Sequence, residues 1–162
     1  MVVVNSSPII ALAKIGKLGL FHKLFDSVSI TGQVYEEIMS KPNYAESIAI
    51  KKAVENDKWV KVHKADEINK ILGIGEASSL SLALKLKQPL IIDDKKAVFI
   101  ANTLGVECHG TLYVILLALR RKIIKNKEEA IDVVNMLINN KLYLSSEALS
   151  EFYTLLNKIN IQ

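Results

Sequence analysis

The sequence predicts an α/β domain in which helices flank a twisted, mainly parallel β-sheet. Short β-branched runs alternate with stretches of helical spacing along all 162 residues. Half of the residues are hydrophobic and 23% are charged, a composition typical of a folded chain. No repeat, low-complexity linker or break in composition divides the chain. We therefore expect one domain over residues 1–162, with helices from about 127–162 packed on it.

The first part of the chain begins this alternation. The expected elements are, in order, a strand at 1–5, helices at 6–16 and 17–25, a strand at 27–30 and a helix that contains 33–39. Ser7 is a candidate N-cap for the first helix, and Gly16 is a candidate stop signal. Thr31 can cap the helix that follows the second strand.

The rest of the chain repeats the pattern. The expected elements are a helix at about 44–56, a strand at 58–62, a helix at 73–87, a strand at 90–92, a helix at 95–104, a strand at 105–108, and helices at 111–121, 127–139 and 146–158. Gly73 and Gly75 lead into the amphipathic helix at 73–87. Strands that alternate with helices favour parallel pairing through right-handed crossovers.

Charge, cysteine content and apolar run length indicate which partners and which compartment suit the protein. Lys and Arg number 21 against 17 Asp and Glu, so a net charge of +4 permits an acidic partner such as nucleic acid. The basic group from Arg120 to Lys127 suits either a helix end or a nucleic-acid surface. Cys108 is the single cysteine and no signal peptide is apparent, so we expect the reducing cytoplasm. The longest apolar run, at 112–119, is too short to span a membrane.

Polar side chains occur where the predicted strands lead into helices. Asn5 follows the first strand, Glu37 lies on the helix after the second, Glu76 begins a helix, and Asp93 with Asp94 follows the strand at 90–92. Parallel sheets bind ligands at the carboxyl ends of their strands. Acids held together raise one another's pKa, so such a cluster usually binds a divalent cation. Oxygen ligands favour Mg²⁺ or Mn²⁺ over zinc.

Each of these residues also has a purely structural interpretation. Asn5 can be a turn residue, and Asp93 or Asp94 can cap a helix. Glu76 can favour the helix dipole, and the glutamates at 36–37 can lie on a solvated face. The joint placement of the acids at strand ends is what favours a site.

Longer blocks of sequence carry a family resemblance. "VVVNSSPIIALAKIGKLGLF", "SITGQVYEEI" and "GIGEASSLSLALKLKQPLIIDDKKAVFIANTLGVECHGTLYVILLALRRKII" occur in this order, and "LYLSSEALSEFYTLLNK" closes the chain. Together they resemble the PIN-domain family of metal-dependent ribonucleases, and more narrowly the VapC-type toxins of prokaryotic toxin–antitoxin pairs. The resemblance implies a three-layer PIN-like fold and an acidic site that binds Mg²⁺ or Mn²⁺ and hydrolyses single-stranded RNA.

The resemblance also implies roles for individual residues. Asn5 stands where the family has its first-strand acid, and the other metal ligands would be Glu37, Glu76 and Asp94, with Asp93 as a possible substitute. Among these, the catalytic residues would be Glu37, Glu76 and Asp94. Small polar positions that resemble site-lining residues of the family are Ser7 and Thr111. The basic residues expected to contact nucleic acid are Lys95, Lys96, Arg120 and Arg121.

The main departure from the family pattern is Asn5. An amide can offer its carbonyl oxygen to Mg²⁺ but contributes no negative charge, so the affinity for metal should fall. The alternative is therefore a catalytically degenerate PIN-like module that binds RNA or protein. The resemblance further implies a small antitoxin protein as partner and assembly as a homodimer.

Overall fold

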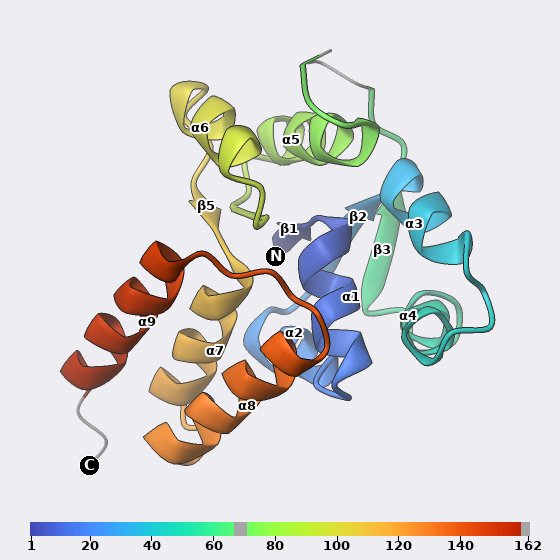
Figure 1. Ribbon diagram of the computed structural model, residues 1–162. Coiled ribbons are helices and arrows are strands. Elements are labelled where there is room, and N and C mark those ends of the chain that lie inside the picture. Colours follow the sequence, from blue (N-terminus) through green and yellow to red (C-terminus); the bar gives the residue numbers. More distant parts are fainter. Residues whose placement is uncertain (67–70, 160–162) are drawn as a thin grey trace.

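Five parallel strands form the central sheet of the computed structural model, which describes residues 1–66 and 71–159 (Figure 1). The strands are β1 (Val2–Val4), β2 (Val28–Thr31), β3 (Val60–His63), β4 (Leu90–Ile91) and β5 (Cys108–His109). Their order across the sheet is β3-β2-β1-β4-β5, and every pair is parallel. The first strand in the sequence, β1, is thus the central one. The predicted α/β class with a parallel sheet is confirmed.

Helices flank both faces of the sheet (Figure 1). They are α1 (Ser6–Lys14), α2 (Gly19–Leu24), α3 (Gly32–Met39), α4 (Ala45–Glu55), α5 (Ile74–Leu86), α6 (Lys95–Thr103), α7 (Thr111–Arg120), α8 (Lys127–Asn139) and α9 (Ser146–Lys158). None of the helices in the described ranges is long and apolar enough to cross a bilayer.

Two hydrophobic cores lie on opposite faces of the sheet. Val2 and Val4 pack into a large core with α1–α4 and α7–α9, whereas Val3 packs into a smaller core with α5 and α6. Successive strand residues point to opposite faces, so β1 must be apolar at every position to bury both. This is why its sequence is a continuous valine run and does not alternate with polar residues.

Local sequence predicts the start of α3 correctly but not the start of α1. Thr31 caps α3 as predicted, and its Oγ1 accepts from the Val34 N–H at 3.2 Å. The prediction that Ser7 caps the first helix is wrong, because α1 already begins at Ser6 and Asn5 is its N-cap residue. The Asn5 N–H donates to the Ile91 carbonyl at 3.0 Å, so the strand pairing runs directly into the helix.

The ends of two predicted strands also differ from the sequence expectation. The strand expected at 105–108 is confined to Cys108–His109, because Gly105 adopts a φ of +76° at the end of α6. The strand expected at 58–62 begins only at Val60, because Lys58 has a φ of +58°. Among the described non-glycine residues, positive φ occurs at four lysines, namely Lys58, Lys87, Lys122 and Lys141. Lys87, Lys122 and Lys141 lie at or directly after the C-caps of α5, α7 and α8, where a left-handed residue ends the helical hydrogen bonding.

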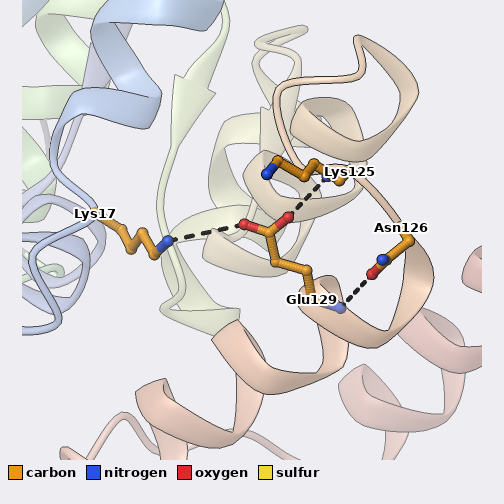
Figure 2. A network of polar contacts seen from close by, with 4 residues as sticks. All are labelled: Lys17, Lys125, Asn126 and Glu129. Atoms are coloured by element: carbon orange, nitrogen blue, oxygen red, sulfur yellow. Dashed lines mark hydrogen bonds and ion pairs between the residues drawn. The ribbon is translucent and has the colours of Figure 1, made fainter.

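The C-terminal helices pack against α7 in the larger core (Figure 1). A polar network at the start of α8 links the C-terminal helices to Lys17, in the connection between α1 and α2 (Figure 2). Asn126 caps α8 by accepting from the Glu129 N–H at 2.8 Å, and Glu129 Oε2 accepts from the Lys125 N–H at 2.8 Å. Lys17 Nζ lies 4.0 Å from Glu129 Oε1. The caps stabilise the helix start, while the partly exposed ion pair adds little.

Candidate functional site

Two of the predicted ligand residues, Asn5 and Glu37, meet at the carboxyl edge of the central strands. Asn5 follows β1 and is only 2% exposed, whereas Glu37 projects from α3 and is exposed. A Cβ atom built on Gly75 would lie 3.2 Å from Glu37 Oε2 and 3.5 Å from Asn5 Oδ1. The carboxylate and the amide oxygen therefore face the same point of the α5 backbone, which is bare because residue 75 is glycine.

Buried hydroxyl groups hold this point in place. Thr31 Oγ1 and Ser78 Oγ lie 2.9 Å apart, and Ser78 Oγ donates to the Gly75 carbonyl at 3.0 Å. Ser79 Oγ donates to Asn5 Oδ1 at 3.4 Å. The start of α5 is thereby linked to the end of β2 and to Asn5. Sequence reasoning missed the role of Gly75 and of both serines, although a glycine and small hydroxyl residues around "GEASS" were an available signal.

Asp93 lies at the end of β4 with both carboxylate oxygens occupied. Its Oδ1 accepts from the Thr111 N–H and its Oδ2 from the Thr111 hydroxyl, each at 2.7 Å. The Ser7 side chain also hydrogen-bonds to this carboxyl group. Burial raises the pKa of Asp93, and the hydrogen bonds from Thr111 and Ser7 partly oppose that rise. Ser7 and Thr111, both predicted to line the site, are thus brought together by Asp93.

Asp94 points elsewhere and caps α6. Its Oδ1 accepts from the Ala97 N–H at 2.7 Å, and the residue is exposed. Within the described residues, its Oδ2 has no hydrogen-bond partner. Asp93 is therefore hydrogen-bonded to neighbouring elements. Asp94 caps its own helix, and its Oδ2 has no partner among the described residues.

Glu76 occupies the first turn of α5. Its carboxylate folds back over Gly73, where an added Cβ atom would collide with Oε2. This position beside the helix N-terminus is favourable for a negative charge. The structure thus brings Asn5 and Glu37 together, while the Glu76 carboxylate lies over Gly73 and Asp94 caps α6.

The predicted nucleic-acid contacts fall into two groups. Lys95 and Lys96 are exposed at the start of α6, next to Asp94. Lys95 Nζ donates to Glu147 Oε2 at 3.3 Å, and Lys96 Nζ donates to the Ile71 carbonyl at 3.1 Å. Arg120 and Arg121 lie at the opposite end of α7 from Thr111, a helix length of about 15 Å for ten residues. Arg121 donates to the carbonyl of α2 residue Leu24 at 3.1 Å. Of the two groups, the lysine pair adjoins a predicted ligand residue, Asp94.

The donor atoms suit a hard divalent cation, but they do not form a complete metal site as they lie. Asn5 and Glu37 offer oxygen atoms, which Mg²⁺ and Mn²⁺ prefer. Among the described residues, however, no three His, Cys, Asp or Glu side chains are grouped closely enough to hold a metal ion. The fit is therefore good at Asn5 and Glu37 and poor at Asp93, whose oxygens already accept hydrogen bonds.

A parallel sheet with polar residues at its carboxyl edge defines a class of α/β proteins that act on ligands at that edge. Residues 1–158 match the model of DUF3368, a family of PIN domains, so the chain belongs to the PIN-domain family. A solved structure of a PilT N-terminus domain protein from the hyperthermophilic archaeon Sulfolobus solfataricus is similar in fold. It shares 19% identity, covers 70% of this chain and 90% of its own, and has a TM-score of 0.50. No curated protein matches the chain. PIN domains are generally nucleases, and the fold is of nuclease type.

Proposed function

We propose that this protein is a divalent-metal-dependent endoribonuclease that hydrolyses single-stranded RNA. The observation that carries the proposal is the approach of Asn5 Oδ1 and Glu37 Oε2 to the bare backbone at Gly75. Oxygen donors at the carboxyl edge of the sheet suit a Mg²⁺ or Mn²⁺ site. Membership of the PIN-domain family supports the same conclusion.

Glu37 and Asn5 are the residues that would hold the ion, with Glu76 and the free oxygen of Asp94 as further ligands once their side chains turn. When bound, the ion lowers the pKa of coordinated water and offsets negative charge on the scissile phosphate. Since Asn5 brings no charge, Glu37 has to supply most of the negative charge at this point. The Glu37 side chain makes no hydrogen bond or ion pair with the described residues, so its carboxylate is available for that role.

Other residues of this edge assist with the substrate. Lys95 and Lys96 place cationic groups beside Asp94, where they would attract RNA phosphates towards an acidic site. We further propose, from the resemblance to VapC-type toxins, that the protein is the toxin of a toxin–antitoxin pair in the cytoplasm. In this proposal it forms a homodimer and is inhibited by a small antitoxin protein.

A second candidate function is a PIN domain that binds RNA or protein without cutting. Two observations favour it specifically. Asn5 replaces the first-strand acid of the family, and the hydrogen bonds of Asp93 occupy a carboxylate that could otherwise replace the lost charge. RNA binding that is independent of metal would distinguish this function from a nuclease.

The test is cleavage of a fluorescent single-stranded RNA with Mn²⁺ or Mg²⁺, compared with EDTA. Glu37→Gln should lower the rate at least ~100-fold, because loss of even an outer-shell partner often costs 10- to 100-fold. Glu36→Gln is the matched control, since Glu36 is exposed on the same helix and its side chain makes no hydrogen bond or ion pair with the described residues. Asp94→Asn removes the charge but keeps the helix cap.

Cleavage that needs metal, survives in Glu36→Gln and is lost in Glu37→Gln supports the nuclease. If the wild type and Glu37→Gln cut equally, or neither cuts while both bind RNA, the nuclease proposal is overturned. The second outcome supports the binding module.

A further inference from the structure

Asp93 is bonded differently from every other acid at the carboxyl edge. The Thr111 N–H and the Thr111 hydroxyl each donate to a separate oxygen of its carboxylate, at 2.7 Å. The Ser7 side chain interacts with the same group and lowers its pKa. A carboxylate has about four acceptor positions, and the Thr111 bonds use one on each oxygen. In contrast, Glu37 has no such partners among the described residues, and Asp94 has one.

These bonds join three elements that are far apart in the sequence. Asp93 follows β4, Ser7 is in the first turn of α1, and Thr111 begins α7. Gly110 permits the close approach, because a Cβ atom built there would lie 3.0 Å from Asp93 Oδ1. The start of α7 is buried at Thr111, so the bonds with Asp93 satisfy polar groups that water does not reach.

The first turn of α1 also determines where Asn5 lies. Asn5 is the N-cap residue of α1, but its side chain makes no capping hydrogen bond. Its amide is instead free to face Gly75 and accept from Ser79. Ser7, two residues later, is the point at which this turn is attached to Asp93. A shift of Ser7 would therefore be passed directly to Asn5.

We propose that Asp93 is a positioning residue that fixes Asn5 by locking the first turn of α1 to the start of α7, and that it does not itself hold the metal ion. The proposal rests on the proposed function for the metal, but the locking of Asn5 does not depend on a bound metal ion. A carboxylate that turned towards an ion would leave the buried Thr111 N–H and hydroxyl without acceptors. Asp93 and Asp94, although adjacent, thus have different roles.

The first measurement is Mn²⁺ binding to the purified protein by calorimetry, without RNA. Glu37→Gln should weaken binding at least ~10-fold because it removes a charged ligand. Asp93→Asn keeps an oxygen acceptor for the Thr111 N–H, so we expect it to weaken Mn²⁺ binding less than Glu37→Gln does. An Asp93→Asn effect as large as that of Glu37→Gln would show that Asp93 is a ligand and would overturn the proposal.

The second measurement does not depend on metal or catalysis. The side-chain amide signal of Asn5 in a ¹⁵N NMR spectrum is assigned by its disappearance in Asn5→Asp. Thr111→Val removes the hydroxyl bond to Asp93 at nearly constant volume and should shift the Asn5 signal, whereas Thr111→Ser should restore it. Thr103→Val, at an exposed hydroxyl on α6, is the control for general effects.

An Asn5 signal that stays in place in Thr111→Val, or moves equally in Thr103→Val, overturns the positioning role. If the wild type binds no Mn²⁺, the proposed function fails and the Asn5 signal alone decides the positioning role. A shift in Thr111→Val that Thr111→Ser reverses then supports it.

Discussion

Gly75→Ala is the substitution that most directly tests the candidate site. The new methyl group would lie 3.2 Å from Glu37 Oε2 and 3.5 Å from Asn5 Oδ1, between the two proposed ligands. Glu37 is exposed and its carboxylate is the end of a flexible side chain, so it can turn away at little cost. Asn5 is buried and cannot move as easily. The methyl group would then occupy the space that the metal ion needs.

The effect on folding should have the opposite sign. Gly75 lies in the first turn of α5, and alanine is favoured over glycine inside helices by about 0.8–1.0 kcal/mol. The gain is smaller where the methyl group is crowded, so we expect an increase of 0 to ~1 kcal/mol in the free energy of unfolding. For a chain of this size, 1 kcal/mol corresponds to a Tm change of about 2–4 °C.

The assay combines thermal unfolding, Mn²⁺ calorimetry and RNA cleavage on the same preparation. We expect Tm to be unchanged or raised while metal affinity falls at least ~10-fold and cleavage falls with it. Gly19→Ala is the matched control, since Gly19 begins α2 and a Cβ atom there would have nothing within 4 Å. Normal metal binding by a well-folded Gly75→Ala protein would refute the placement of the ion beside Asn5 and Glu37.

Three further predictions concern stability and reactivity. Lys87 ends α5 in the left-handed conformation, at φ 53° and ψ 46°, so Lys87→Gly should stabilise the protein by about 0.5–1 kcal/mol in urea denaturation, whereas Lys85→Gly inside the helix should destabilise it by about 1 kcal/mol. Burial, with Lys61 and Lys85 nearby, lowers the pKa of His63. The unfolded chain therefore binds a proton at higher pH than the folded chain does, and stability should fall as pH drops below the ordinary histidine value of about 6.5, less so in His63→Gln. Burial and the charge of Glu107 raise the pKa of Cys108 to about 11, so its alkylation by iodoacetamide at pH 7.5, followed by mass spectrometry, should be at least ~10-fold slower than after denaturation in urea.

Each of these predictions has an outcome that contradicts it. Destabilisation by both Lys87→Gly and Lys85→Gly would show that the left-handed residue is not strained. An identical pH profile for the wild type and His63→Gln would remove His63 as the cause of acid sensitivity. Equal alkylation rates before and after denaturation would mean that the Cys108 thiol is reactive in the fold.

Much of the fold could be read from the sequence because its signals are local. The valine run of β1, the cap at Thr31 and the helical spacing of the "GEASSLSLALKL" stretch each depend on neighbours within a few residues. The parallel sheet then followed from the alternation of strands and helices. Where local signals competed, the prediction failed: Ser7 and Asn5 could each begin α1, and pairing of Asn5 with Ile91 decided between them.

By itself, the sequence determined which polar residues would lie at the carboxyl edge, because every parallel strand ends on the same side of the sheet. Only the tertiary structure decided which of these residues contact one another and which bond to other partners. Asn5 meets Ser79 across 74 positions and Asp93 meets Thr111 across 18, and such contacts depend on how the helices pack. Two adjacent aspartates that look equivalent in the chain therefore differ, because successive residues leave a strand in different directions and reach different partners.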